Sequence, residues 1–202
     1  MFERYQRAGN FVVNPILNSL RGIGVKPKTI LEIGCGAGHR LALLQRDFAA
    51  ECHGVEPSQL AVNYAHQHYP KLQVRTGTAE TLDYNDDAFD VVIFGFCLYL
   101  CDPADHFRIA WQADRVLQNK GYLVINDFLA PTPYSNDYVY VPEMRSYKME
   151  WAHMFAWNPT YRLVSRRYHE DKDRLTFVPN EQISVDVLRK DRSIAFPPNP
   201  FL

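Results

Sequence analysis

The sequence has few cysteines, no long hydrophobic run and no secretion signal. The four cysteines, Cys35, Cys52, Cys97 and Cys101, form no CxxC pair, so the sequence predicts neither a disulfide framework nor a metal site. The longest apolar run, 91–101, is too short to cross a bilayer. The N-terminus lacks the basic and apolar regions of a signal peptide. We therefore expect a cytoplasmic protein with no metal and no membrane partner.

A surplus of positive charge is also missing. The chain has 22 Lys and Arg against 23 Asp and Glu, a net charge of -1, and a pI near 6.6. General nucleic-acid binders usually carry a basic patch and a high pI, so we expect a small-molecule partner and no nucleic acid. A length of 202 residues with 47% hydrophobic side chains fits one domain around a full core.

Short apolar segments alternate with amphipathic ones over the first two thirds of the chain. Continuous apolar runs are typical of parallel strands buried on both faces, and the segments between them place apolar residues on one helical face. This alternation favours right-handed crossovers and a doubly wound α/β sheet. The expected strands are Thr29–Ile33, Cys52–Glu56, Gln73–Thr76, Val91–Gly95 and Gly121–Asp127, and the expected helices are Arg40–Phe48, Ser58–His68 and Ala104–Gln118.

The last third of the chain has a different pattern. Tyr161–Tyr168 and Ile183–Lys190 alternate polar and apolar residues with no helix between them. They predict an antiparallel hairpin at the sheet edge, which brings the sheet to seven strands. Residues 131–159 show no strand pattern, and within them Ser146–Trp157 has the spacing of a short helix.

Three glycines follow the first expected strand within five residues. The segment Glu32-Ile33-Gly34-Cys35-Gly36-Ala37-Gly38 leads from this strand to the start of a helix at 39–40. Glycine is needed where the backbone adopts positive φ or approaches a ligand closely. A helix N-terminus offers free N–H groups to a negative group. This glycine turn is therefore the expected ligand site.

Two acidic residues frame the glycine turn. Glu56 ends the second strand, 22 residues after Gly34, where a carboxylate can accept hydrogen bonds from both ribose hydroxyls of a nucleoside. Glu32 suits a ligand with a cationic amino group. The dinucleotide fingerprint is G-x-G-x-x-G, whereas this turn reads G-x-G-x-G and has His39 at the last position of that fingerprint. The spacing favours a nucleoside that carries an amino acid, and an NAD-dependent oxidoreductase is the alternative.

Five segments together resemble the class I S-adenosylmethionine-dependent methyltransferases, in particular those that act on small molecules. They follow the family's order and spacing over about half of the chain. The resemblance implies a Rossmann-like fold, S-adenosylmethionine as cofactor, and in-line transfer of its methyl group to a small-molecule acceptor. A non-catalytic S-adenosylmethionine-binding protein is a further alternative. The segments are the glycine turn, Val55–Ser58, Gly77–Leu82, Phe89–Ile93, and Arg115–Leu117 with Gly121–Ile125.

The resemblance also implies the cofactor-binding residues. The glycines would line the methionine and ribose parts of the donor, the carboxylate at the end of the second strand would bind the ribose, Thr78 and Ala79 would meet the adenine, and the fourth strand would end under the donor. Thr78 stands where the family often has aspartate, and a threonine accepts a hydrogen bond from the adenine amine less strongly. The expected set is Glu32, Gly34, Cys35, Gly36, Gly38, Glu56, Pro57, Thr78, Ala79, Glu80, Phe94, Gly95 and the lid aromatic Tyr5.

The acceptor site is expected in the aromatic residues 131–159, the one large insertion over the strand ends. These residues predict a lid with an apolar inner wall. His153 is the expected base for a hydroxyl or amine acceptor, because its ordinary pKa is near neutrality. Tyr147 is a further catalytic candidate, and Asp127 would orient the base or bind the acceptor. Alternatively the aromatics are core, Asp127 caps a turn, and no base is used.

These expectations divide one methyltransferase domain into four parts. The parts are an N-terminal helical lid (1–28), a cofactor-binding core (29–127), an aromatic acceptor lid (128–160), and the edge hairpin with the tail (161–202).

Overall fold

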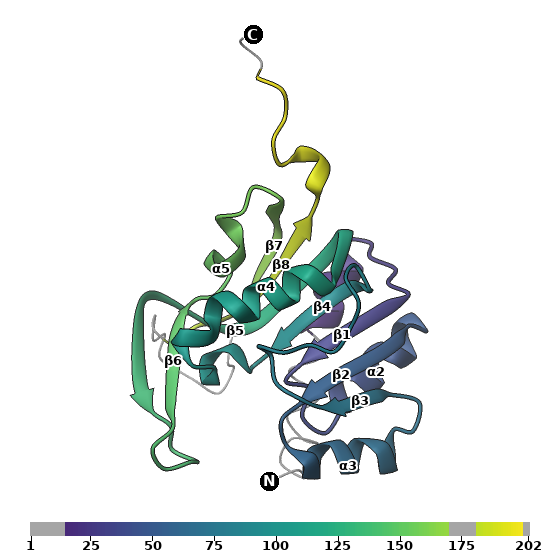
Figure 1. Ribbon diagram of the computed structural model, residues 1–202, viewed down its shortest axis with the longest axis vertical. Coiled ribbons are helices and arrows are strands. Elements are labelled where there is room, and N and C mark those ends of the chain that lie inside the picture. The colour runs from purple at the N-terminus through teal and green to yellow at the C-terminus, as the bar shows by residue number, and fades with distance from the viewer. Residues whose placement is uncertain (1–14, 170–180, 200–202) are drawn as a thin grey trace.

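The computed structural model describes residues 15–169 and 181–199, and its strands form one mixed sheet (Figure 1). The order is β3-β2-β1-β4-β5-β8-β7, with β6 paired to β5 outside this path. β8 and β7 are the antiparallel strands on the C-terminal side, which confirms the predicted fold class. The strands are β1 (Thr29–Ile33), β2 (Glu51–Glu56), β3 (Gln73–Thr76), β4 (Phe89–Gly95), β5 (Leu117–Asp137), β6 (Arg145–Glu150), β7 (Tyr161–His169) and β8 (Ile183–Lys190).

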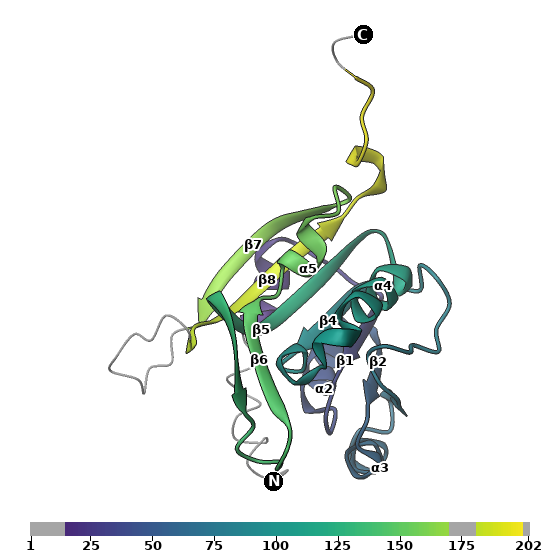
Figure 2. The same ribbon diagram turned by 60° about the vertical axis from the view of Figure 1, so that its left-hand side comes forward.

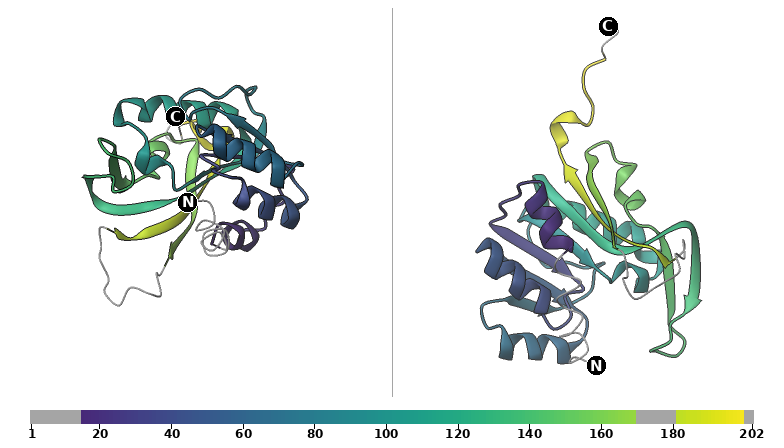
Figure 3. Two further views of the ribbon diagram at one scale, coloured as in Figure 1. Left: turned by 90° about the horizontal axis from the view of Figure 1, so that it is seen from below. Right: turned by 180° about the vertical axis from the view of Figure 1, so that it is seen from behind.

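Helices cover both faces of the sheet. Residues 15–22 are helical and pack with α2 and α3 over one core, to which β1 contributes Ile30 (Figure 3). α4 and α5 cover the other core, the second core, to which β1 contributes Leu31. The helices are α2 (His39–Phe48), α3 (Gln59–His68), α4 (His106–Val116) and α5 (His153–Ala156), with the 3-10 turns η1 (Leu98–Leu100), η2 (Pro103–Asp105) and η4 (Arg192–Ile194). Within the described residues, no helix is long and apolar enough to span a membrane.

The parallel strands bring three segments to one edge of the sheet. Ile33, the last residue of β1, pairs with Val55 of β2 and Phe94 of β4. The carboxyl ends of parallel strands lie at the same edge. The glycine turn, Glu56 and Gly95 therefore meet there.

Strand β5 runs past its predicted end at Asp127. It continues to Asp137, and its outer part pairs with β6 in an antiparallel hairpin that projects from the sheet (Figure 2). The prediction that residues 131–159 contain no strand is therefore wrong. Pro131 and Pro133 read as strand breakers, but both lie in the irregular stretch between the paired residues Leu129 and Tyr134, where no ladder N–H is needed.

The helix predicted over Ser146–Trp157 is also wrong. Arg145–Glu150 forms β6, and only the single turn His153–Ala156 is helical. The buried positions of β6 are Ser146 and Lys148, two polar residues, so the usual alternation of apolar inward and polar outward residues is hidden in the sequence.

Lys148 anchors this hairpin to the residues before β8. Its side chain is buried, and its Nζ lies 2.6 Å from Glu181 Oε1. The same Nζ lies 4.1 Å from the ring centroid of Phe128 and 5.4 Å from that of Tyr134. Cation–π contacts of this kind add to the ion pair when the cation is shielded from water. The hairpin is thus attached to the sheet by a buried cation.

We predict that Lys148→Met loosens the hairpin without unfolding the chain. The methionine keeps the apolar stem but loses a charge-assisted hydrogen bond, worth about 1.5–3 kcal/mol. Amide hydrogen exchange in β6 should therefore accelerate by about tenfold or more. Lys71→Met, at an exposed position outside the hairpin, is the control. Equal protection of β6 in both variants would contradict the anchoring role.

Candidate functional site

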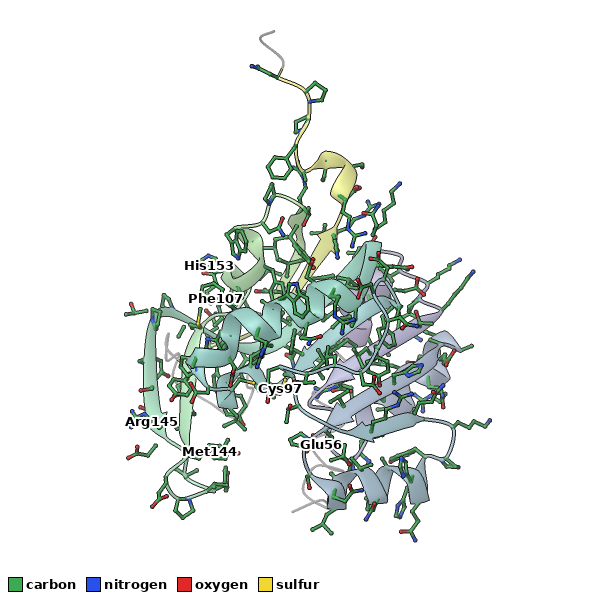
Figure 4. All side chains as sticks on the ribbon, viewed as in Figure 1. Glu56, Cys97, Phe107, Met144, Arg145 and His153 are labelled. Carbon is green, nitrogen blue, oxygen red and sulfur yellow. The ribbon has the colours of Figure 1, made fainter. Side chains whose placement is uncertain are left out.

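A cavity of about 710 Å³ opens at the carboxyl edge of the sheet. Glu56 and Met144 approach it from opposite sides, one from β2 and one from the β5–β6 hairpin, with Cys97 between them (Figure 4). The rest of its described lining comes from the glycine turn with the start of α2, the segment from the end of β2 to the start of α3, the loop after β3, the residues after β4 and the start of α4. This volume is in the range of small-molecule sites.

The glycine turn presents bare backbone to the cavity. Gly34 has φ 72°, and a Cβ there would lie 2.5 Å from Cys97 Cβ, so only glycine lets η1 approach the turn. Gly36 has φ 54°, and a Cβ there would meet no heavy atom within 4 Å. Both residues line the cavity, whereas Gly38 is the N-cap of α2 behind it. The open space at Gly36 is what close approach of a ligand requires.

Glu56 is held beside this turn by two backbone donors. Gly36 N donates to Oε2 at 2.9 Å, and Ser58 N donates to Oε1 at 3.1 Å. The carboxylate lines the cavity and is half-buried. An ionised carboxylate can accept about four hydrogen bonds, so lone pairs remain for hydroxyl donors from a ligand.

Glu32 lies behind the cavity wall. Its side chain is fully buried, and Oε1 lies 2.5 Å from Arg40 Nε. Burial raises the pKa of this carboxyl, while the Arg40 guanidinium lowers it. The predicted contact of Glu32 with a ligand amino group is not part of this geometry, because the carboxylate interacts with Arg40 and does not line the cavity.

The other expected cofactor residues divide into two groups. Phe94 is fully buried in the second core, with its ring 6.3 Å from that of Phe155, and its neighbour Gly95 faces the cavity instead. Tyr5 lies outside the described residues. The remaining residues line the cavity, namely Cys35, Pro57, Thr78, Ala79 and Glu80.

Three cysteines line the cavity, and burial favours the neutral form of their thiols. Burial raises the pKa of Cys35 and Cys97 well above the ordinary value, and that of Cys101 to about 12. Cys97 Sγ donates to Ile33 O at 3.1 Å, and Cys101 Sγ donates to Cys97 O at 3.3 Å. Because the thiolate is the nucleophilic form, the raised pKa values disfavour reaction at these sulfurs at neutral pH. No metal-binding group of three or more His, Cys, Asp or Glu occurs among the described residues.

None of the three catalytic candidates is among the described residues that line the cavity. His153 is on α5 with its side chain 68% exposed, and its Nε2 lies 3.4 Å from Glu150 (Figure 4). Tyr147 on β6 packs against the second core. Trp151 and Phe155 of the predicted lid are also core residues. The base assigned to His153 stays a prediction that this geometry does not support.

Asp127 supports the cavity wall from behind. It is 1% exposed, and its carboxylate accepts hydrogen bonds from the backbone N–H groups of Phe128, Tyr99, Leu98 and Cys97. The last three belong to or precede η1, which lines the cavity. Asp127 therefore has the geometry of a turn cap, which is one of the two roles that the sequence left open for it.

Sequence reasoning missed several lining residues. His39 and Arg40 follow the glycine turn in the sequence, and this position could have indicated that they line the cavity. Phe96 has φ 57°, a left-handed conformation that is rare for a bulky residue and typical of functional sites. Met144 reaches the cavity only because β5 and β6 form a hairpin, and is the one described residue of 131–159 in the lining. Tyr99 and Leu100 come from η1.

We predict that Asp127 makes the stability of the protein depend on pH. Burial raises its pKa from 3.8 to about 7, so between these values the folded state holds a proton that the unfolded state has lost. Its contribution is complete below about pH 4 and is lost as the pH rises through about 7, by about 1.4 kcal/mol for each unit of pKa difference. Asp127→Asn cannot titrate. Urea unfolding from pH 4.5 to 7.5 should therefore show the wild type losing stability relative to Asp127→Asn. Parallel curves would contradict the shifted pKa.

Comparisons with known proteins find similarity to methyltransferases. The family model "Methyltransferase domain" matches residues 31–125. The uncharacterized methyltransferase YcgJ of Bacillus subtilis is 31% identical over 64% of this chain and 55% of its own length. The demethylmenaquinone methyltransferase of Thermotoga maritima is 31% identical over 53% of this chain and 46% of its own. The chain thus spans about half the length of these curated relatives.

A solved structure shares the fold over most of both chains. The 1,6-didemethyltoxoflavin-N1-methyltransferase of Burkholderia thailandensis, with 1,6-didemethyltoxoflavin and S-adenosylhomocysteine bound, has a TM-score of 0.69 at 16% identity and covers 94% of this chain and 85% of its own. The matched residues 31–125 contain the glycine turn, Glu56 and Gly95. Residues 31–125 match the methyltransferase domain, and these similarities support a class I S-adenosylmethionine-dependent methyltransferase.

Proposed function

We propose that this protein binds S-adenosylmethionine in the cavity and transfers its methyl group to a small organic acceptor. The observation that carries the proposal is the pairing of Gly36 with Glu56. A backbone open to the cavity lies next to a carboxylate whose two oxygens are already oriented by N–H donors. This pairing suits a nucleoside whose ribose hydroxyls hydrogen-bond to the carboxylate.

The residues present fit S-adenosylmethionine. Glu56 would hold the ribose hydroxyls, and the backbone at Gly34 and Gly36 would allow close approach of the amino-acid and ribose parts. Thr78 and Ala79 would meet the adenine. All five line the same cavity.

When bound, S-adenosylmethionine supplies a methyl group on a sulfonium whose leaving group is already activated. The chain's own contribution is then to hold the two reactants in line and to exclude water. The neutral thiols of Cys97 and Cys101 suit this role, because a thiolate beside a sulfonium would compete as a methyl acceptor. Neither His153 nor Tyr147 is among the described residues that line the cavity.

The acceptor would lie between η1 and the hairpin. Phe96, Tyr99, Leu100 and Met144 give this part of the cavity an apolar surface, which suits an organic molecule with an apolar body. The names of the Thermotoga relative and of the Burkholderia enzyme likewise refer to small organic acceptors. Methylation assays with radiolabelled S-adenosylmethionine over a panel of such compounds test the acceptor class.

We predict that Gly36→Ala weakens S-adenosylhomocysteine binding. The new methyl group would project into the open space of the cavity, and the positive φ costs about 1–2 kcal/mol of strain. The matched control is Gly24→Ala, which has φ 73° and equally open space but does not line the cavity. Calorimetry should show at least about tenfold weaker binding for the first variant only. Equal affinities of the two variants would remove the glycine turn from the donor site.

We predict that Glu56→Ala weakens S-adenosylhomocysteine binding by about tenfold or more. A hydrogen bond to a charged group contributes about 1.5–3 kcal/mol. The substitution also leaves Gly36 N without its hydrogen-bond acceptor. Glu51→Ala removes a carboxylate from the other end of β2, where it is exposed, and should bind like the wild type. A change below about twofold in Glu56→Ala would mean that this carboxylate does not contact the ligand.

A further inference from the structure

Arg40 stands out among the charged side chains of the cavity. Of the described lining residues, it alone is a lysine or arginine, whereas four are acidic: Glu56, Glu80, Asp102 and Asp105. The neighbouring His39 does not add positive charge, since burial lowers the pKa of its ring. Among the described lining residues, Arg40 is therefore the main cation that can pair with an anionic group in this cavity.

The structure holds this guanidinium in one orientation. Arg40 Nε lies 2.5 Å from Glu32 Oε1, and Nη2 donates to Gly95 O at 2.9 Å. Glycine at position 95 is part of the arrangement, because a Cβ there would collide with the guanidinium. The side chain is 13% exposed. Glu32 and Gly95 therefore act as positioning residues for Arg40.

The third nitrogen of the guanidinium, Nη1, takes no part in these contacts. Arg40 Nη1 is buried and has no hydrogen-bond partner among the residues that the structure describes. A buried donor without a partner is costly, and guanidinium N–H groups match the geometry of a carboxylate. The arrangement is that of a preformed carboxylate-binding group, which an apolar or neutral ligand would leave unsatisfied.

We propose that Arg40 binds the α-carboxylate of the methyl donor, with Glu32 and Gly95 as its positioning residues. The inference rests on the proposed function and names the residue that recognises the amino-acid end of the donor. S-adenosylmethionine carries one carboxylate and no other anion. Arg40 lies in the first turn of α2, directly after the glycine turn, so it stands at the same end of the cavity as Gly34 and Gly95.

The test compares two ligands that differ only in the carboxylate. Calorimetry measures Kd for S-adenosylhomocysteine and for S-adenosyl-3-thiopropylamine, the same molecule without its carboxylate. The variants are R40M and the double variant E32Q/R40M, which removes both buried charges and so avoids leaving Glu32 unpaired. R46M, in the last turn of α2 with a side chain 69% exposed, is the matched control.

We expect the wild type and R46M to prefer S-adenosylhomocysteine by at least about tenfold, and the two Arg40 variants to reduce this preference below about threefold. Affinity for the decarboxylated ligand should stay within about twofold in all four proteins. An unchanged preference in E32Q/R40M, or equal weakening of both ligands, would overturn the role of Arg40 while leaving donor binding intact. A wild type that binds neither ligand would overturn the proposed function together with this inference.

Discussion

The cavity depends on the hydrogen bond from Gly36 N to Glu56 Oε2, which joins the turn after β1 to the end of β2. The parallel pairing of Ile33 with Val55 brings these two segments within reach. The positive φ at Gly36 then turns its N–H toward the carboxylate and leaves its Cα facing open space. One local constraint thus positions the acidic group and clears the surface next to it.

Buried polar groups behind the cavity wall support the lining. Glu32 orients Arg40, and Asp127 caps the backbone of η1, so both act from behind the cavity wall. Neither carboxylate is exposed to solvent. Burying such groups is costly unless they are hydrogen-bonded. Backbone donors bind Asp127, and the Arg40 guanidinium binds Oε1 of Glu32, whereas Glu32 Oε2 has no partner among the described residues. This arrangement separates the residues that shape the site from those that would touch a ligand.

The part of the fold that positions the donor was predictable from the sequence. Parallel strands buried on both faces appear as apolar runs, so β1 and β3 began and ended where expected. The glycine spacing and Glu56 correctly predicted where the cavity lies. Both occur at the ends of strands, whose positions follow from the sequence pattern. Arg40 was harder to recognise, since an arginine early in a helix is usually a solvated side chain, and its ion pair with Glu32 depends on tertiary structure.

The β5–β6 hairpin, beside the proposed acceptor site, was not predictable in the same way. β6 buries Ser146 and Lys148, and β5 contains two prolines within an irregular stretch, so neither strand has an ordinary hydrophobic pattern. Treating Ser146–Trp157 as a helix placed His153 near the expected lid. The strand instead carries the chain to the second core, where Trp151 and Phe155 pack, and leaves His153 at the surface.

The central claim is that the glycine turn and Glu56 serve a nucleoside with an amino acid and not a dinucleotide. Thermal unfolding of the wild-type chain with S-adenosylmethionine, S-adenosylhomocysteine or NAD tests it directly. A ligand at a hundredfold excess over its Kd stabilises the folded state by about 2.7 kcal/mol, which raises Tm by several degrees for a chain of this size. The account predicts such a rise with the first two ligands and none with NAD. A rise with NAD alone would contradict it.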